Sequence, residues 1–245
     1  MRDLNYSISA EVFRQFPEYI RGVVVAHQVH NQSSPPELVE LLRESGTNLR
    51  QRFTLEQFLA DPKIAVWREA FRAMGVKPSE YRPSIEALGR RVLRGQELPS
   101  INALVDIGNL VSLNFIAPTG GHAIDHLTQD IALRPATGQE TFIPFGDSGG
   151  EGAENPAPGE LVFVEGEVVL TRRWIWRQSN HTLTLPSTTT IEFNVDALPP
   201  FTRAEVEEIC QAVMRLVERF CGGHMWYALL TKDSPVMALS YPPEM

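Results

Sequence analysis

The stretch Tyr81–His126, YRPSIEALGRRVLRGQELPSINALVDIGNLVSLNFIAPTGGHAIDH, decides how this chain is interpreted. It predicts an amphipathic helix over Ser84–Arg94, a linker ending in proline, and a second apolar helix over Asn102–Leu113. The second helix is unusual, because burying an unpaired amide or carboxylate costs roughly 1–3 kcal/mol. This helix is expected either to build an internal polar network or to line a pocket that contains water. The Gly-Gly-His that follows favours the pocket. Its polar residues are Asn102, Asp106, Asn109, Ser112 and Asn114.

The rest of the pattern predicts a mixed α+β fold, with helices first, strands later and a final helix. We expect one compact domain over residues 1–245, a mixed β-sheet with flanking helices. Further helices are expected from Pro35, from Thr54 through to Gly75, and over Glu205–Phe220, and a Gly/Pro-rich loop at Phe145–Gly159. The expected strands are Tyr19–Val29, one or more between Asp125 and Ile143, Leu161–Glu165, Glu167–Arg172, Thr182–Val195, Trp226–Thr231 and Val236–Leu239.

Composition narrows the classes of partner. The 30 acidic and 22 basic residues leave a net charge of −8, whereas proteins that hold long nucleic-acid backbones are usually basic. General binding of RNA or DNA is therefore disfavoured, although a transient contact with one end of an RNA stays open. No apolar run approaches the ~20 residues of a membrane span, the N-terminus lacks the apolar core of a secretory signal, and there are only two cysteines. We expect a reduced, cytoplasmic protein away from the membrane.

One motif imitates a serine protease. Residues 146–150 spell GDSGG, the sequence around the nucleophile of trypsin-like enzymes, and His27, Asp130 and Ser148 follow in the right order. However, only 18 residues separate Asp130 from Ser148, whereas that family places the two on distant parts of two barrels. The disulfides of that family are also missing. The motif is interpreted as a loop that uses Gly, Asp and Ser for turns.

A second motif, His122, Asp125 and His126, has the spacing H-x-x-D-H. An inverted zinc-protease motif has this form with Glu, on a helix that presents both histidines one turn apart. No clear third ligand follows, so we expect no metal, and a loop histidine followed by a strand is favoured.

The third motif is the opening stretch, and it resembles a known family. INALVDIGNLVSLNFIAPTGGHAID, residues 101–125, looks like the core of the B3/B4 editing domain in the beta subunit of bacterial phenylalanyl-tRNA synthetase. The flanks, YRPSIEALGRRVLRGQELP and GELVFVEGEVVLTRRWIWRQS, look still more like freestanding single-domain proteins of the same superfamily. The resemblance covers about 78–223, and residues 1–77 match more loosely. The matched motif positions are Asn102, Val105, Asp106, Ile107, Asn109, His122, Ala123 and Asp125.

The resemblance implies a hydrolase that clears misacylated tRNA in trans, without a cofactor. By this analogy Asn109 binds the polar groups of the substrate, and His122 contacts the ester or the terminal ribose, or orients water. Gly120 and Gly121 let backbone N–H groups approach the ligand closely. Gly108 stands where the synthetase commonly has Thr or Ser, which leaves room for a larger side chain.

The same analogy assigns the pocket wall and the contacts with RNA. Trp174 or Trp176 would narrow the pocket or stack on a base. The synthetase domain has a pocket glutamate where this chain has Asn194, and Glu192, on the same face of the expected strand, would occupy nearby space. The aminoacylated 3′ end of tRNA is the expected partner, and a homo-oligomer stays open. The arginines expected at the RNA are Arg90, Arg91, Arg94, Arg173 and Arg177.

Each of these residues also has a purely structural interpretation. Asn109 and Asp106 would be a satisfied core network, the arginines a solvated helix face, and the tryptophans ordinary packing against a sheet. The missing glutamate and the acidic charge favour a non-catalytic module that binds tRNA or an amino acid. Asn109 and the Gly-Gly-His favour the enzyme.

Overall fold

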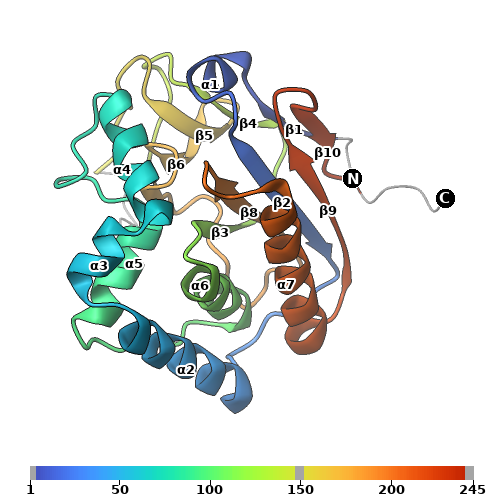
Figure 1. The fold of residues 1–245 in the computed structure, drawn as a ribbon. Helices are drawn as coiled ribbons and strands as arrows, with labels where there is room; N and C mark the ends of the chain where they lie inside the picture. The colour runs from blue at the N-terminus through green and yellow to red at the C-terminus, as the bar shows by residue number, and fades with distance from the viewer. Residues whose placement is uncertain (1–3, 147–151, 241–245) are drawn as a thin grey trace.

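The computed structural model describes residues 4–146 and 152–240 (Figure 1). Within these residues it shows an α+β fold of seven helices and two β-sheets, which confirms the expected fold class. One hydrophobic cluster extends from Tyr6 to Leu239, so both sheets and the helices share a core.

The larger sheet has six strands in the order β10-β1-β4-β5-β6-β7. Neighbouring strands run antiparallel, except that β1 and β4 are parallel. The hairpin of β5 and β6 turns at Gly166, where φ is +54°, as expected from the sequence. The bounds are β1 Asn5–Ile8, β4 Ile131–Pro135, β5 Leu161–Glu165, β6 Val168–Arg172, β7 Arg177–Gln178 and β10 Val236–Ala238.

The smaller sheet is fully antiparallel, in the order β3-β8-β2-β9. Its inner strands are almost completely buried, and β8 alternates apolar and polar residues. Because successive side chains of a strand point to opposite faces, β8 gives the sheet one apolar face and one polar face. The bounds are β2 Ile20–His27, β3 Thr119–Ala123, β8 Thr190–Ala197 and β9 His224–Leu230.

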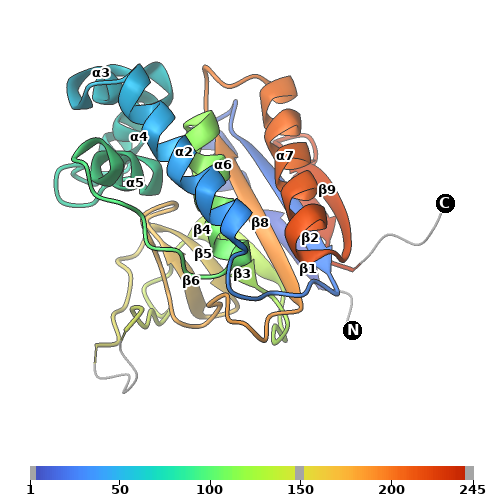
Figure 2. The ribbon, with the colours of Figure 1, turned by 90° about the horizontal axis from the view of Figure 1, so that it is seen from below.

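Helices α6 (Ala103–Phe115) and α7 (Arg203–Cys221) cover the apolar face of the smaller sheet, and α2 (Pro36–Arg52) packs on α6 (Figure 2). Asn102 caps α6 through the Val105 N–H, and α7 begins with a capping box of Thr202 and Glu205. The polar face is turned toward the six-stranded sheet.

The remaining helices are α1 (Ala10–Gln15) and the group α3 (Leu55–Ala60), α4 (Pro62–Ala73) and α5 (Ser84–Leu93). The sequence predicted a single helix from Thr54 to Gly75, and this is wrong. Pro62 interrupts it, since proline clashes with the preceding turn, and the Asp61 side chain starts α4 by accepting from the Lys63 N–H at 2.9 Å.

Other boundaries also differ. The strand predicted over Thr182–Val195 is limited to β8, and residues 182–189 form a loop that contains Pro186. Between Asp125 and Ile143 only β4 is a regular strand. Elements β1, α1, β3 and β7 were not predicted. The predicted loop at 145–159 has no helix or strand in its described part, and residues 147–151 lie outside the described residues.

Composition led to expectations about membrane-spanning segments and about the two cysteines. Among the described residues no helix is both long and apolar enough to cross a membrane. Cys210 and Cys221 are buried and unbonded, and burial raises the pKa of the Cys210 thiol to about 12.

Candidate functional site

The Gly-Gly-His motif forms β3, the edge strand of the smaller sheet. Antiparallel pairing with β8 places Gly120 opposite Asn194 and His122 opposite Glu192. The Gly120 N–H donates to Asn194 Oδ1 at 3.2 Å. A Cβ on Gly121 would lie 3.0 Å from Ile191 and 3.2 Å from Phe193. The close approach that glycine permits here is therefore between two strands, rather than between the backbone and a ligand as we expected.

His122 is fixed between threonine hydroxyls on the polar face of the sheet. Only 2% of the residue is exposed. Its Nδ1 lies 2.6 Å from the Thr182 hydroxyl and its Nε2 lies 3.2 Å from the Thr171 hydroxyl. Burial, together with the charge of Arg21, lowers the pKa of His122 to about 3. The ring is therefore neutral, with one donor and one acceptor nitrogen.

Glu192, the cross-strand neighbour of His122, is fully buried and neither of its carboxylate oxygens has a hydrogen-bond partner among the described residues. Burial raises the pKa of Glu192 to about 8, the Arg21 charge lowers it in part, and Asp196 raises it further. The side chain is therefore mainly a neutral carboxylic acid at pH 7. Strongly perturbed groups of this kind are concentrated at functional sites.

A buried ion pair lies next to Glu192 on the same face of the sheet. Arg21 Nη2 approaches Asp196 Oδ1 at 2.7 Å, and both side chains are at most 2% exposed. Tyr19 also donates to Asp196 Oδ1, and Tyr6 contacts Arg21 Nη1 at 2.7 Å. The polar face thus contains a connected network, as buried charges require.

Trp174 belongs to this network and to the core. It is 1% exposed, and its Nε1 lies 3.2 Å from the Tyr19 hydroxyl and 3.3 Å from Asp196 Oδ1. Its ring meets Trp67 edge-on, with the ring centroids 5.2 Å apart. The expectation that Trp174 stacks on a base is wrong, because its indole is buried in the core. The chain adopts positive φ values at Arg173 (47°) and Trp174 (66°).

Arg173 is likewise not a surface contact for RNA. Its guanidinium lies 3.6 Å from the ring centroid of Tyr81 and 4.6 Å from that of Trp176, and its side chain is 13% exposed. Trp176 is half-buried against Tyr81. These three side chains pack the 173–176 turn against the start of α5. Arg177, two residues from the turn, is exposed.

The structure does not join Asn109 to His122. Gly108 faces the apolar side of the sheet, where a Cβ would lie 3.7 Å from Phe193, whereas His122 projects from the polar side. Asn109 is half-buried on α6 and its amide has no hydrogen-bond partner among the described residues. Asp106, also on α6, is satisfied by Ser34, Ser100 and the Ile101 N–H, which fits the interpretation of a core network.

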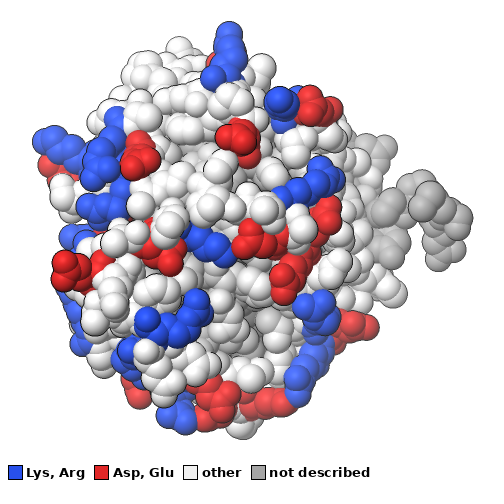
Figure 3. All heavy atoms as spheres, viewed as in Figure 1, with Lys and Arg blue, Asp and Glu red and all other residues white. Residues whose placement is uncertain are grey.

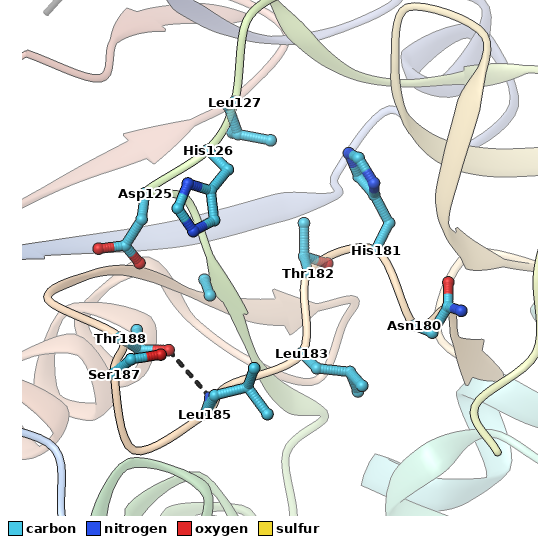
Figure 4. Close-up of a pocket in the computed structure, with 11 residues that line it drawn as sticks. Asp125, His126, Leu127, Asn180, His181, Thr182, Leu183, Leu185, Ser187 and Thr188 are labelled. Carbon is cyan, nitrogen blue, oxygen red and sulfur yellow. Dashed lines mark hydrogen bonds between the residues drawn. The ribbon is translucent and has the colours of Figure 1, made fainter. Parts of the chain in front are cut away.

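A cavity of about 120 Å³ with both polar and apolar lining residues lies beside β3 (Figure 4). Thr182 links the two, because it lines the cavity while its hydroxyl contacts His122. Sequence reasoning missed Thr171, Thr182 and Gln178, since no local motif marks them and they lie far along the chain from β3. The polar and charged residues that line the cavity besides Thr182 are Asp125, His126, Asn180, His181, Ser187 and Thr188.

A basic hollow of about 310 Å³, defined by Arg82, Arg90, Arg91 and Arg94, lies on α5 and its flanks. Arg90 is partly engaged, because its Nε contacts the buried Glu86 at 2.7 Å, and Arg68 shares the same carboxylate oxygen. Arg82, Arg91 and Arg94 are exposed. On the face drawn in Figure 3 acidic and basic groups are interspersed, with many basic groups along the edge where α3, α4 and α5 lie.

The H-x-x-D-H motif forms no metal site among the described residues, and the GDSGG motif lies partly outside them. Among the described residues no group of three or more His, Cys, Asp or Glu side chains is arranged to hold a metal ion. Asp125 is instead engaged by the Thr189 hydroxyl at 2.6 Å, and His122 lies in a strand rather than in a loop. Asp130 accepts from the Asn5 N–H, and Ser148 lies outside the described residues.

Comparison with known proteins identifies the family. Among solved structures, the chain is similar to an N-terminal fragment of the phenylalanyl-tRNA synthetase beta subunit from Pyrococcus horikoshii, with a TM-score of 0.47 and 8% identity. That match covers 91% of this chain and 53% of the fragment, so the chain spans about half the length of the fragment. No curated protein matches. The family model for the B3/4 domain matches residues 66–222, which is more than half of the sequence, and the chain therefore belongs to the B3/4 domain family.

Proposed function

We propose that this protein hydrolyses the ester of misacylated aminoacyl-tRNA in trans. The observation that carries the proposal is the cavity whose wall residue Thr182 is held by a neutral, buried His122, in a chain of the B3/4 domain family. The resemblance of residues 101–125 to an editing domain supports ester hydrolysis as the reaction in this cavity.

The reaction needs little from the protein. Water adds to the ester carbon, and the bond from that carbon to the ribose oxygen breaks. A proton from the water is transferred to the departing ribose oxygen, which leaves as a hydroxyl. An aminoacyl ester is activated, so positioning the reactants and donating to the developing oxyanion are sufficient. Around the cavity, Thr182, Ser187 and Asn180 provide hydroxyl and amide donors.

His122 acts in this proposal as a positioning residue. It is 2% exposed and does not line the cavity, so it influences the substrate through the Thr182 hydroxyl, 2.6 Å from its Nδ1. Asn109 remains a candidate contact for the terminal nucleotide, because its half-buried amide is unpartnered among the described residues.

The basic hollow is proposed to hold phosphates of the tRNA. A backbone contact joins the helix of the hollow to the segment that leads into the cavity: the Ser84 N–H at the start of α5 donates to Ile175 O at 2.8 Å. Along the chain, Ile175 is followed by Arg177 and Gln178 and then by Asn180, the first residue of this segment that lines the cavity. Exposed arginines along this path would neutralise backbone charge, which is the main source of affinity for RNA.

The decisive test is deacylation of a panel of misacylated tRNAs by the wild type, His122→Ala, Thr182→Val and the double variant. Each single change should lower the rate about tenfold or more, and the double variant should be no slower than the slower single variant, because both changes break one contact. Fully additive losses would show that His122 does not act through Thr182.

Asn109→Ala belongs in the same assay, with Asn114→Ala as its matched control, because Asn114 is an exposed asparagine of the same helix. A loss of rate confined to Asn109→Ala supports its contact with the nucleotide. Equal rates for the two variants would remove Asn109 from the site.

Binding of tRNA tests the basic hollow. The double change Arg91→Ala and Arg94→Ala should weaken binding and reduce the slope of log K against log salt by about 2. Arg215→Ala, an exposed arginine on α7, is the control and should leave the slope unchanged. Equal effects of both would show that the hollow is not the contact.

A non-catalytic module that binds tRNA is the second candidate. It is favoured by one observation, that His122 and Glu192 are 2% and 0% exposed and neither lines the cavity. If no tRNA of the panel is hydrolysed above the spontaneous rate and tRNA still binds in a manner that depends on Arg91 and Arg94, this second function replaces the first.

A further inference from the structure

A second histidine, which no motif singled out, enters the cavity from the loop after β7. His181 lines the cavity, and 38% of its side chain is exposed. Its Nε2 lies 2.7 Å from Glu165 Oε2. Figure 4 shows the His181 ring across the hollow from His126, with Thr182 next to it on the same loop.

Glu165 is held rigidly in the anionic form. It ends β5 and is 4% exposed, and its other oxygen, Oε1, accepts from the Thr128 N–H at 2.5 Å and the Gln129 N–H at 3.0 Å. Burial alone raises the pKa of Glu165, but the hydrogen bonds from Thr128, His181 and Gln129 outweigh it and the pKa is lowered.

A carboxylate that accepts a hydrogen bond from Nε2 determines the tautomer of the imidazole. The proton then resides on Nε2, and Nδ1 keeps a free lone pair. A base whose far nitrogen is oriented by a buried carboxylate is the arrangement that general-base catalysis uses. An ordinary surface ion pair would not need a carboxylate that also accepts from the Thr128 N–H, the Thr128 hydroxyl and the Gln129 N–H.

We propose that His181, oriented by Glu165, is the general base that activates water in this cavity, and that the substrates are esters with a small acyl group. This inference rests on the proposed function. His181 Nδ1 takes a proton from the water as the oxygen bonds to the ester carbon. The bond from that carbon to the ribose oxygen then breaks, and the imidazolium returns the proton to the departing oxygen.

The size of the cavity sets the substrate class. A cavity of about 150 Å³ holds one benzene molecule. At about 120 Å³, this cavity is smaller than that, so it suits a short side chain better than an aromatic one. The hydroxyls of Thr182, Ser187 and Thr188 around it suit a small polar side chain such as that of serine.

The test compares the wild type with His181→Gln and Glu165→Gln on tRNAs carrying seryl, alanyl, phenylalanyl or tyrosyl esters. His181→Gln should lower the rate of the seryl or alanyl ester by about 10²–10⁴, the usual contribution of a general base. Glu165→Gln should cost about 10², because the amide N–H₂ facing Nε2 favours the tautomer in which Nδ1 carries the proton. The phenylalanyl and tyrosyl esters should be hydrolysed much more slowly than the seryl and alanyl esters.

A pH profile separates chemistry from structure. The wild-type rate should fall on acidification as the imidazole gains a proton, and this limb should be absent in His181→Gln. The charged groups that face His181 are Glu165, in contact, and Asp125 and His126, which line the same cavity. His30→Gln, an exposed histidine outside the cavity, is the matched control and should keep the wild-type rate and profile.

The outcomes distinguish the two proposals. If the wild type is active and folded His181→Gln is equally active, the general base is overturned while the function stands. If no tRNA is hydrolysed, the proposed function fails. Hydrolysis of p-nitrophenyl acetate then tests whether His181 is a general base. Loss of this activity in His181→Gln supports that role, and equal activity of the variant and the wild type overturns it. Rapid hydrolysis of the phenylalanyl ester would overturn the assigned substrate class.

Discussion

The two faces of the smaller sheet are built on opposite principles although they share every strand. On β8, Ile191, Phe193 and Val195 point toward α6 and α7, while Glu192 and Asp196, one position away from these, point toward the six-stranded sheet. Both faces are buried. One face is closely packed hydrocarbon, and the other holds charges, a neutral acid and a neutral histidine.

The difference indicates where stability and function reside. Buried apolar groups contribute favourably in proportion to the area removed from water, whereas buried ion pairs are often no better than an apolar replacement. An unpartnered carboxyl such as that of Glu192 is a net cost. One member of the polar face, His122, contacts Thr182, which lines the cavity.

The largest effect is expected for Asp196→Ala. This change leaves Arg21 buried without its counter-ion and should lower the free energy of unfolding by about 3–5 kcal/mol. Val195→Ala, the neighbouring position on the apolar face, removes only two methyl groups and should cost less. Urea unfolding of both variants measures the difference, and equal costs would break the comparison between the faces.

The pH dependence of stability tests Glu192. Its pKa is about 8 in the folded protein against 4.5 for the unfolded group, so the folded state binds more protons between these values. The contribution of Glu192 to the free energy of unfolding should therefore fall as pH rises from 4.5 to 8, by up to about 1.4 kcal/mol per pH unit. His122 opposes this trend up to about pH 6.5, so the decline should be seen between pH 6.5 and 8. Glu192→Gln should remove this decline in urea titrations. An identical decline in the variant would show that Glu192 is charged in the folded state.

His122 should give stability the opposite dependence on pH. Its pKa is about 3 in the folded protein against 6.5 for the unfolded group, so the unfolded chain binds more protons between these values. The contribution of His122 to stability should therefore be lost as pH falls from 6.5 to 3, again by up to about 1.4 kcal/mol per unit. Glu192 offsets this loss down to about pH 4.5, so the loss should be seen between pH 4.5 and 3. His122→Gln should flatten this limb and leave the limb above pH 7 unchanged. A charged His122 at pH 5, visible by NMR, would contradict the prediction.

Two helices, α5 and α7, could be predicted because their signals are local. Ser84–Leu93 and Arg203–Cys221 have helical periodicity, and the latter also has the Thr202 cap. The hairpin at Gly166 is likewise local. In contrast, β3 has the sequence TGGHA, which has little strand propensity and becomes a strand only by pairing with β8, about 70 residues away.

The candidate site was predicted only in part, for the same reason. His122 and Glu192 were identified from the resemblance, but their partners Thr171 and Thr182 come from a distant hairpin and loop. The loop was predicted as a strand because Thr and Leu alternate in it. Trp174 was assigned to a pocket wall because nothing in the sequence indicates that its indole is buried in the core.

The smallest expected effect concerns the packing of the apolar face. A Cβ on Gly22 would lie 2.4 Å from Cys210 Sγ on α7 and 3.1 Å from Val206. Gly22→Ala should therefore destabilise the protein by about 1–3 kcal/mol through overpacking. Adding Cys210→Ala removes the sulfur atom that clashes, so the double variant should be more stable than Gly22→Ala alone. Additive losses in thermal unfolding would show that α7 shifts to admit the methyl group, and that the apolar face is less closely packed than the contact between Gly22 and Cys210 indicates.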